Sequence, residues 1–110
     1  MSRRVLIAEP NADVRALLEL TVHRLGYEPV LPHEAGRGDV DAILLEPACA
    51  VGRSVLRRFG SETPPVVCLS VYPREEGLEP SASVAYLVKP ASSAAIGTAL
   101  GRVFADSCAH

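Results

Sequence analysis

The chain has 110 residues and a mass of 11.7 kDa, which suits a single domain spanning 1–110, and 48% of its residues are hydrophobic, enough for one packed core. A formal net charge of −2 excludes a general electrostatic attraction to nucleic acid or to an anionic membrane. No apolar run approaches the ~20 residues that span a bilayer, and the N-terminus lacks a signal-peptide pattern, so we expect a cytoplasmic protein.

The first third of the chain predicts a strand, a helix and a second strand. Val5–Ala8 is a short apolar run typical of a strand. A helix is predicted from about Asp13 to Leu25, with Asn11 as its N-cap. Its apolar face comprises Val14, Leu17, Leu18, Thr21, Val22 and Leu25. Val30–Leu31 predicts a short second strand, which belongs at a sheet edge because Pro29 cannot donate a ladder hydrogen bond.

The middle of the chain predicts a weak connection, a buried strand and a basic helix. Residues 33–40 hold two glycines and two acids around little apolar surface, which indicates a loop or a single turn. Ala42–Leu45 predicts the third strand, and a helix is expected from about Arg53 to Phe59, ended by Gly60. Three side chains of this helix are interpreted as a solvated face, namely Arg53, Arg57 and Arg58.

The last third predicts two more strands and a final helix. The strands are Val66–Leu69 and Ala85–Val88, and the stretch 72–83 between them contains two prolines and a glycine, which indicates a loop or a single turn. The final helix is capped near residues 92–93 and is followed by a short tail that includes Cys108. The runs at 42, 66 and 85 are continuous, which is typical of parallel strands covered on both faces, so the predicted class is an α/β sandwich.

Polar side chains follow the predicted strands, where ligands of open parallel sheets bind. They are Glu9, Glu46, Ser70 and Lys89. The fragments VLIAEPNADVR, AILLE, PPVVCLS and YLVKP, in this order, resemble the receiver domain of two-component response regulators over nearly the whole chain. The resemblance implies a flavodoxin-like fold with five parallel strands in the order 2-1-3-4-5, and here the second and fourth helices are expected to be short or missing.

The chain departs from the receiver pattern at two positions. The resemblance puts Glu46 at the position of the phosphoacceptor aspartate, and it reduces the acidic pair that follows the first strand to Glu9 and Pro10. The side chain of Pro10 cannot ligate a metal, and the neutral Asn11 is a third candidate ligand only. Because Mg²⁺ requires well-placed carboxylates, we expect weak or absent Mg²⁺ binding, no resident cofactor, and Glu9 and Glu46 as weak metal candidates at most.

Three further positions match the receiver pattern. By resemblance, Ser70 supplies the hydroxyl that contacts a phosphoryl group, Lys89 supplies the ammonium that pairs with it, and Tyr86 is the aromatic switch residue. The resemblance also implies a cis Lys89-Pro90 bond, which the sequence alone leaves open. Glu46 has two interpretations, either a partial imitation of an acyl phosphate or a simple salt bridge to Lys89.

The resulting expectation is a non-enzymatic, phosphorylation-independent receiver-like domain that signals through protein–protein contact. Its expected partner is a signalling or output protein, with a histidine kinase as one candidate, and the resemblance allows a homodimer through the last strand and last helix. Two alternatives stay open: a weakly phosphorylatable, Mg²⁺-dependent receiver in a histidine kinase phosphorelay, and a small-ligand binder at the strand-end crevice. Neither nucleic acid nor membrane is an expected partner.

Overall fold

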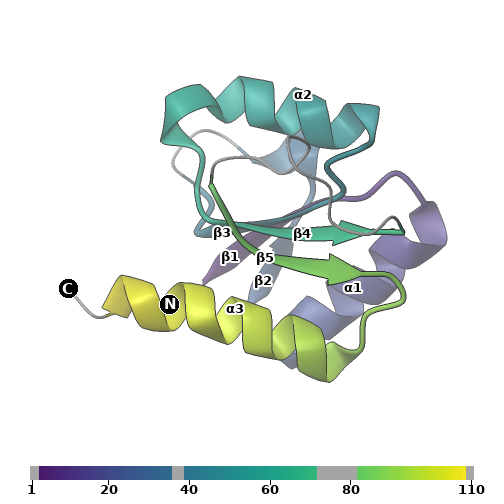
Figure 1. Ribbon diagram of the computed structural model, residues 1–110, viewed down its shortest axis with the longest axis vertical. Helices are drawn as coiled ribbons and strands as arrows, with labels where there is room; N and C mark the ends of the chain where they lie inside the picture. Colours follow the sequence, from purple (N-terminus) through teal and green to yellow (C-terminus); the bar gives the residue numbers. More distant parts are fainter. Residues whose placement is uncertain (1–2, 36–38, 72–81, 109–110) are drawn as a thin grey trace.

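Five parallel strands form one sheet in the computed structural model, which describes residues 3–35, 39–71 and 82–108 (Figure 1). The order is β2-β1-β3-β4-β5, as the resemblance implies, and every neighbouring pair is parallel. The strands are β1 (Arg4–Ala8), β2 (Glu28–Val30), β3 (Ala42–Leu45), β4 (Val66–Ser70) and β5 (Ser83–Val88). The short strand that contains Pro29 lies at one edge, which confirms the prediction made from its missing donor.

Helices cover both faces of this sheet (Figure 1). They are α1 (Ala12–Arg24), α2 (Ala50–Phe59) and α3 (Ser93–Cys108), together with the single 3-10 turns η1 (Pro32–Glu34) and η2 (Gly60–Glu62). The helix α2 packs on one face, and α1 and α3 pack on the other. None of the helices in the described part of the chain combines the length and the hydrophobicity needed to cross a membrane.

Strict alternation along the strands divides the core into two layers. In β1, Val5 and Ile7 join the cluster under α1 and α3, whereas Leu6 and Ala8 join the cluster under α2. The same alternation continues through β3 and β4. Successive side chains of a strand point to opposite faces, so a strand covered on both sides must be apolar at every position, which explains the continuous runs in the sequence.

Local capping determines both ends of α1. The Asn11 side chain accepts hydrogen bonds from the backbone N–H groups of Asp13 (2.9 Å) and Val14 (3.1 Å), which confirms the predicted N-cap. At the other end Gly26 adopts φ +93°, a conformation that favours glycine, and its N–H donates to the carbonyl of His23. The helix ends at Arg24, one residue before the predicted end.

The structure corrects three predictions about the helices. The helix α2 starts at Ala50 rather than near Arg53, because the Cys49 thiol caps it by accepting the N–H of Gly52 at 3.2 Å. The helix α3 includes Cys108, where the sequence had predicted a tail. Leu17, placed on the apolar face of α1, is 65% exposed, because that face is wider than the strip that contacts the sheet.

The two connections predicted as irregular are described in part. Between β2 and β3 the chain forms only η1, in agreement with the prediction of a loop or single turn, while residues 36–38 lie outside the described part. Of the stretch 72–83, residues 72–81 also lie outside it. The prediction for that segment therefore stays a prediction.

Candidate functional site at the carboxyl edge of the sheet

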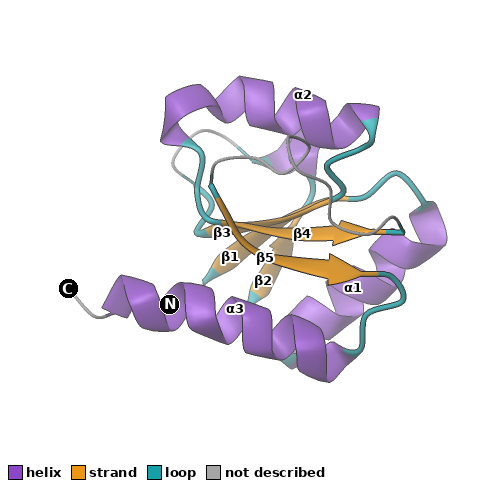
Figure 2. Ribbon diagram, viewed as in Figure 1, coloured by secondary structure: helices purple, strands orange, loops and turns teal. Residues whose placement is uncertain are grey.

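The carboxyl ends of four strands bring the predicted site residues to one edge of the sheet. Glu9 follows β1 and Glu46 follows β3, while Ser70 ends β4 and Lys89 follows β5. Because all strands are parallel, their carboxyl ends meet at the same edge, as the arrowheads of β4 and β5 indicate (Figure 2). Residues far apart in the sequence are thus neighbours here.

Glu9 is a buried carboxylate with two defined partners. Its residue is only 5% exposed. Oε2 accepts a hydrogen bond from the backbone N–H of Asn11 at 3.1 Å, and Oε1 pairs with the Lys89 ammonium. The same short loop therefore presents Asn11 to cap α1 and its N–H to orient Glu9.

Glu46 is held in a similar way on the other side of the Lys89 ammonium. It is 6% exposed, and its Oε1 accepts the backbone N–H of Ala48 at 3.2 Å. Its Oε2 lies 3.4 Å from Lys89 Nζ. The backbone carbonyl of Glu46 accepts the thiol of Cys49 at 3.1 Å, which ties this loop to the start of α2.

Lys89 connects the two carboxylates, and we call Glu9, Glu46 and Lys89 the carboxylate–lysine triad. The backbone N–H of Lys89 donates to the carbonyl of Ser70 at 2.8 Å, and the Lys89-Pro90 bond is cis, as the resemblance implies. The side chain of Lys89 is 15% exposed. Two carboxylates and one ammonium leave the triad with a formal charge of −1, and each ion is both paired and hydrogen-bonded, which a buried charge requires.

The remaining predicted site residues lie around the triad rather than within it. Pro10 is exposed beside it and offers no ligand atom. Ser70 is 1% exposed and takes part in the site through its carbonyl, which accepts the N–H of Lys89. Tyr86 is half-buried and packs against the core cluster under α2. Their predicted roles, as phosphoryl contact for Ser70 and switch for Tyr86, stay predictions.

Two hollows open beside the triad. The first, of about 310 Å³, is lined by Glu9, Pro10, Asn11, Val14, Glu46, Ala48, Cys49, Val71 and Lys89. The second, of about 380 Å³, we call the apolar groove, and it is lined by Val14, Leu17, Leu18, Thr21, Leu69, Val71, Lys89, Pro90, Ala91 and Ile96. Val14, Val71 and Lys89 border both hollows. The triad thus lies at one end of an exposed, mostly apolar depression between α1 and the start of α3.

The donor set at the triad does not fit a magnesium ion. Mg²⁺ requires oxygen ligands in near-octahedral geometry, usually including one or two carboxylates that are open to it. Both carboxylates here are already paired with Lys89, and the position after Glu9 holds a proline. Within residues 3–35, 39–71 and 82–108, no group of three or more histidine, cysteine, aspartate or glutamate side chains is arranged to hold a metal.

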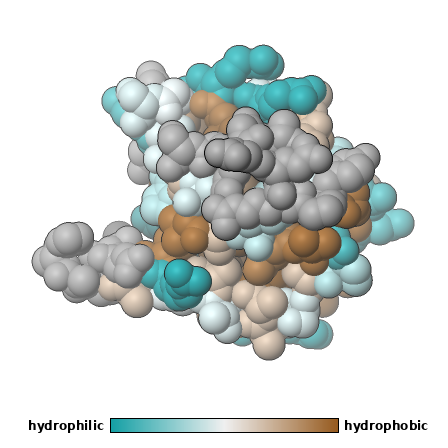
Figure 3. Space-filling view, viewed as in Figure 1, coloured by the Kyte–Doolittle hydropathy of each residue, from teal (hydrophilic) through white to brown (hydrophobic). Residues whose placement is uncertain are grey.

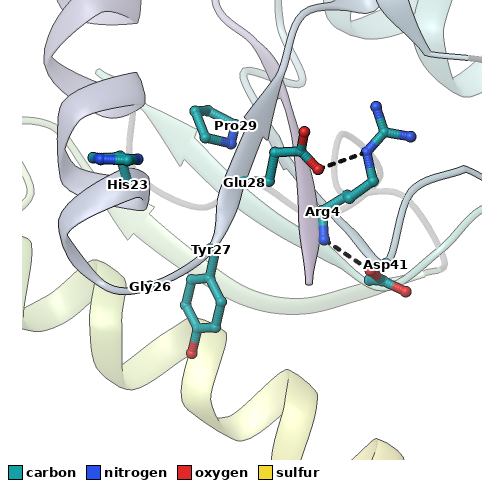
Figure 4. A pocket seen from close by; sticks show the side chains of 7 residues that line it. All are labelled: Arg4, His23, Gly26, Tyr27, Glu28, Pro29 and Asp41. Atoms are coloured by element: carbon teal, nitrogen blue, oxygen red, sulfur yellow. Dashed lines mark hydrogen bonds and ion pairs between the residues drawn. The ribbon is translucent and has the colours of Figure 1, made fainter. Parts of the chain in front are cut away.

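A wider hollow of about 760 Å³ lies at the opposite, amino-terminal end of the strands (Figure 4). Its charged side chains have defined partners: Arg4 Nε lies 3.1 Å from Glu28 Oε2, and Asp41 Oδ2 accepts the backbone N–H of Arg4 at 2.7 Å. These contacts connect β1 to β2 and to the residue before β3. No predicted site residue lines this hollow, and we interpret its charged groups as structural.

Sequence reasoning missed two features of the site. It considered a Glu46–Lys89 salt bridge but not the pairing of Lys89 with Glu9, although Glu9, Glu46 and Lys89 all follow strands that end at one edge. It also missed the apolar groove. The sequence of α1 could have indicated this groove, because the apolar residues of the helix cover more of its surface than one sheet contact can bury.

Comparison with known proteins identifies the fold. No family model and no curated protein matches the sequence. Among solved structures, a sensor protein from Polaromonas sp. JS666 is similar with a TM-score of 0.77 and 24% identity, over 94% of this chain and 97% of that one.

Two further solved structures give the same result. The receiver domain of a sensor histidine kinase from Pseudomonas aeruginosa PAO1, solved with a coordinated magnesium ion, has a TM-score of 0.76 and 23% identity over 96% and 99% of the two chains. The chemotaxis protein CheY4 of Vibrio cholerae has a TM-score of 0.74 and 19% identity over 94% and 99%. With its sheet order of 2-1-3-4-5 and helices on both faces, the chain has the flavodoxin-like fold of CheY-like receiver domains.

Proposed function

We propose that the chain is a receiver-like signalling module that works without phosphorylation, by protein–protein contact in the cytoplasm, and that it has no enzymatic activity of its own. The observation that carries this proposal is the carboxylate–lysine triad. The Lys89 ammonium contacts both Glu9 and Glu46, so the chain supplies its own cation between the two carboxylates that the resemblance offers as metal candidates.

The geometry of Glu46 supports the same proposal. A glutamate carries its carboxylate one methylene further from the backbone than an aspartate, and a misplacement of ~1 Å in a reacting group can lower a rate by about 100-fold. Here one oxygen of Glu46 is held by the N–H of Ala48 and the other faces Lys89. We assign Glu46 the role of a fixed structural anion, the simpler of its two predicted roles.

The apolar groove is the proposed contact surface for the protein partner. Leu17 and Val71 line it and are 65% and 61% exposed, although both are large hydrophobic residues. Exposed apolar side chains that gather around a groove are a common feature of protein-binding surfaces. A signalling or output protein, with a histidine kinase among the candidates, would dock there; a homodimer through β5 and α3 stays a prediction.

The proposal predicts that the wild-type pocket does not respond to Mg²⁺ or to a phosphoryl analogue. We would record amide NMR spectra during titration with Mg²⁺, up to about 20 mM, and then with beryllofluoride. No saturable shifts are expected at Ser70 or Lys89 in the wild type. A Pro10→Asp/Glu46→Asp variant, which restores the receiver residues, is expected to shift at both positions because its carboxylates suit the metal.

A Pro10→Ala/Glu46→Gln variant is the matched control, since it changes the same two positions without adding a carboxylate. Like the wild type, this control should show no saturable amide shifts. Saturable wild-type shifts around Ser70 and Lys89 would contradict the proposal and favour the phosphorylatable alternative.

A further inference from the structure

The outer side of α2 is basic and plays no part in the proposed function. The helix contains Arg53, Arg57 and Arg58 and no acidic residue, and all three arginines are exposed. Its inner side packs on the sheet through Val55 and Phe59. The hydrophilic surface over α2 is visible at the top of the space-filling view (Figure 3). We call these three side chains the arginine face.

The arginine face has no carboxylate partner within the described residues. Arg58 Nη2 donates to the carbonyl of Pro32 at 2.8 Å, and Arg53 Nη1 reaches the carbonyl of Ala48 at 3.5 Å, the limit for a hydrogen bond. Both acceptors are neutral. The ion pairs found in the described part of the chain involve other cations, namely Arg4, Arg15 and Lys89. Among the residues that the structure describes, the three positive charges of this short helix thus have no ion-pair partner.

Helix stability explains only part of this pattern. Arg57 and Arg58 lie in the last turn of α2, where a positive charge is favourable because of the helix dipole. Arg53 lies in the first turn, where a positive charge is unfavourable. Arg53 and Arg57 are also four residues apart and repel each other on the same side of the helix. These two electrostatic contributions of Arg53 to α2 are unfavourable, and a bound anion would offset them.

The charge of the rest of the chain favours a discrete acidic protein segment over a polyanion. The chain has a net charge of −2, so the residues outside α2 carry −5 once its three arginines are subtracted. A nucleic acid or an anionic membrane would be repelled by this remainder. A short acidic segment can contact the arginine face alone, and guanidinium groups bind carboxylates in bidentate geometry.

We propose that the arginine face binds an acidic protein segment whose carboxylates recur one helical turn apart, matching the spacing of Arg53 and Arg57. The site is distinct from the apolar groove, because α2 covers the opposite face of the sheet from α1 and α3 (Figure 1). The domain therefore has two separate contact surfaces, and the loss of one leaves the other intact.

The test uses the whole chain and a capped helical peptide of repeated Glu-Ala-Ala-Ala units. In an amide NMR titration, peptide-induced shifts are expected at Arg53 and Arg57 and should disappear when NaCl is raised from about 50 to about 500 mM. An Arg53→Gln/Arg57→Gln variant should bind roughly tenfold more weakly. Arg24→Gln/Arg102→Gln is the matched control: it removes the same charge from exposed positions on α1 and α3, and its binding should change less than about twofold.

Three results would overturn the proposal. One is the absence of shifts on α2 with the peptide, and the second is equal weakening by the two double variants, which would indicate a response to net charge alone. The third is a stronger response of the α2 amides to a DNA duplex or to phosphatidylserine vesicles than to the peptide. Thermal unfolding of both variants would verify that they are folded. None of these results depends on the outcome of the Mg²⁺ titration. A failure of this proposal can therefore be distinguished from a failure of the proposed function.

Discussion

Replacing Lys89 with methionine is expected to lower the free energy of unfolding by about 3 kcal/mol at neutral pH, because it leaves two buried carboxylates without their cation. Glu9 and Glu46 are 5% and 6% exposed, and within the described part of the chain each retains one backbone N–H donor after the substitution. Methionine has a similar volume to lysine, so the change tests charge rather than packing. Urea denaturation of the variant and the wild type would measure the difference.

Removing the charges of the two unpaired carboxylates as well should restore most of the lost free energy of unfolding. A Glu9→Gln/Glu46→Gln/Lys89→Met variant carries no ion at the triad and is expected to recover most of the lost stability, since replacing a whole buried ion cluster is often near neutral. Arg15→Met is a useful comparison, because Arg15 pairs with Glu19 at 3.9 Å on the exposed side of α1 and should cost less than about 0.5 kcal/mol. If Lys89→Met cost no more than Arg15→Met, the triad would not be a tightly coupled ion cluster.

A second large effect is expected at Gly52, where Gly52→Ala should destabilise the domain by about 2 kcal/mol. An added Cβ would lie 2.2 Å from the carbonyl oxygen of Glu46 and 3.3 Å from Leu45 Cγ. The nearest atom belongs to the backbone and cannot rotate away, so α2 or the Glu46 loop must move. This steric cost outweighs the gain of about 1 kcal/mol that alanine normally brings to a helix.

Gly101→Ala is the matched control in α3. An added Cβ there meets nothing within 4 Å, so the higher helix propensity of alanine should raise stability by about 0.5 to 1 kcal/mol. If Gly52→Ala lowers the stability and Gly101→Ala raises it, the close contact at Gly52 is the cause of the loss. Thermal unfolding gives both signs, and a neutral Gly52→Ala would mean that α2 can shift away from Glu46 at little cost.

The Gly52 contact also links the core to the candidate site. The loop that holds the Glu46 carboxylate against Lys89 is the same loop that Gly52 and the Cys49 thiol approach. A displaced loop in Gly52→Ala should therefore also change the amide shifts of Ala48, which donates to Glu46. The packing of α2 and the geometry of the triad are predicted to change together.

Local pattern was enough to predict most of the fold. The continuous run in Ala42–Leu45 indicated a strand buried on both faces, and Pro29 indicated an edge strand; both are confirmed. Asn11 marked the start of the first helix because an Asn side chain satisfies the free N–H groups there. The start of α2 was less predictable, since cysteine is not a typical cap and Cys49 acquires that role from its contact with the Glu46 carbonyl.

By itself, the sequence determined the strands, their two-faced burial, the sheet order through the receiver resemblance, and the polar residues that would meet at one edge. Only the tertiary structure decided how these residues combine. Lys89 lies 80 positions from Glu9, and no local sequence pattern predicts that its ammonium reaches both Glu9 and Glu46. Pairing between distant ions depends on strand register and burial, because charges removed from water must find partners among whatever side chains the fold brings together.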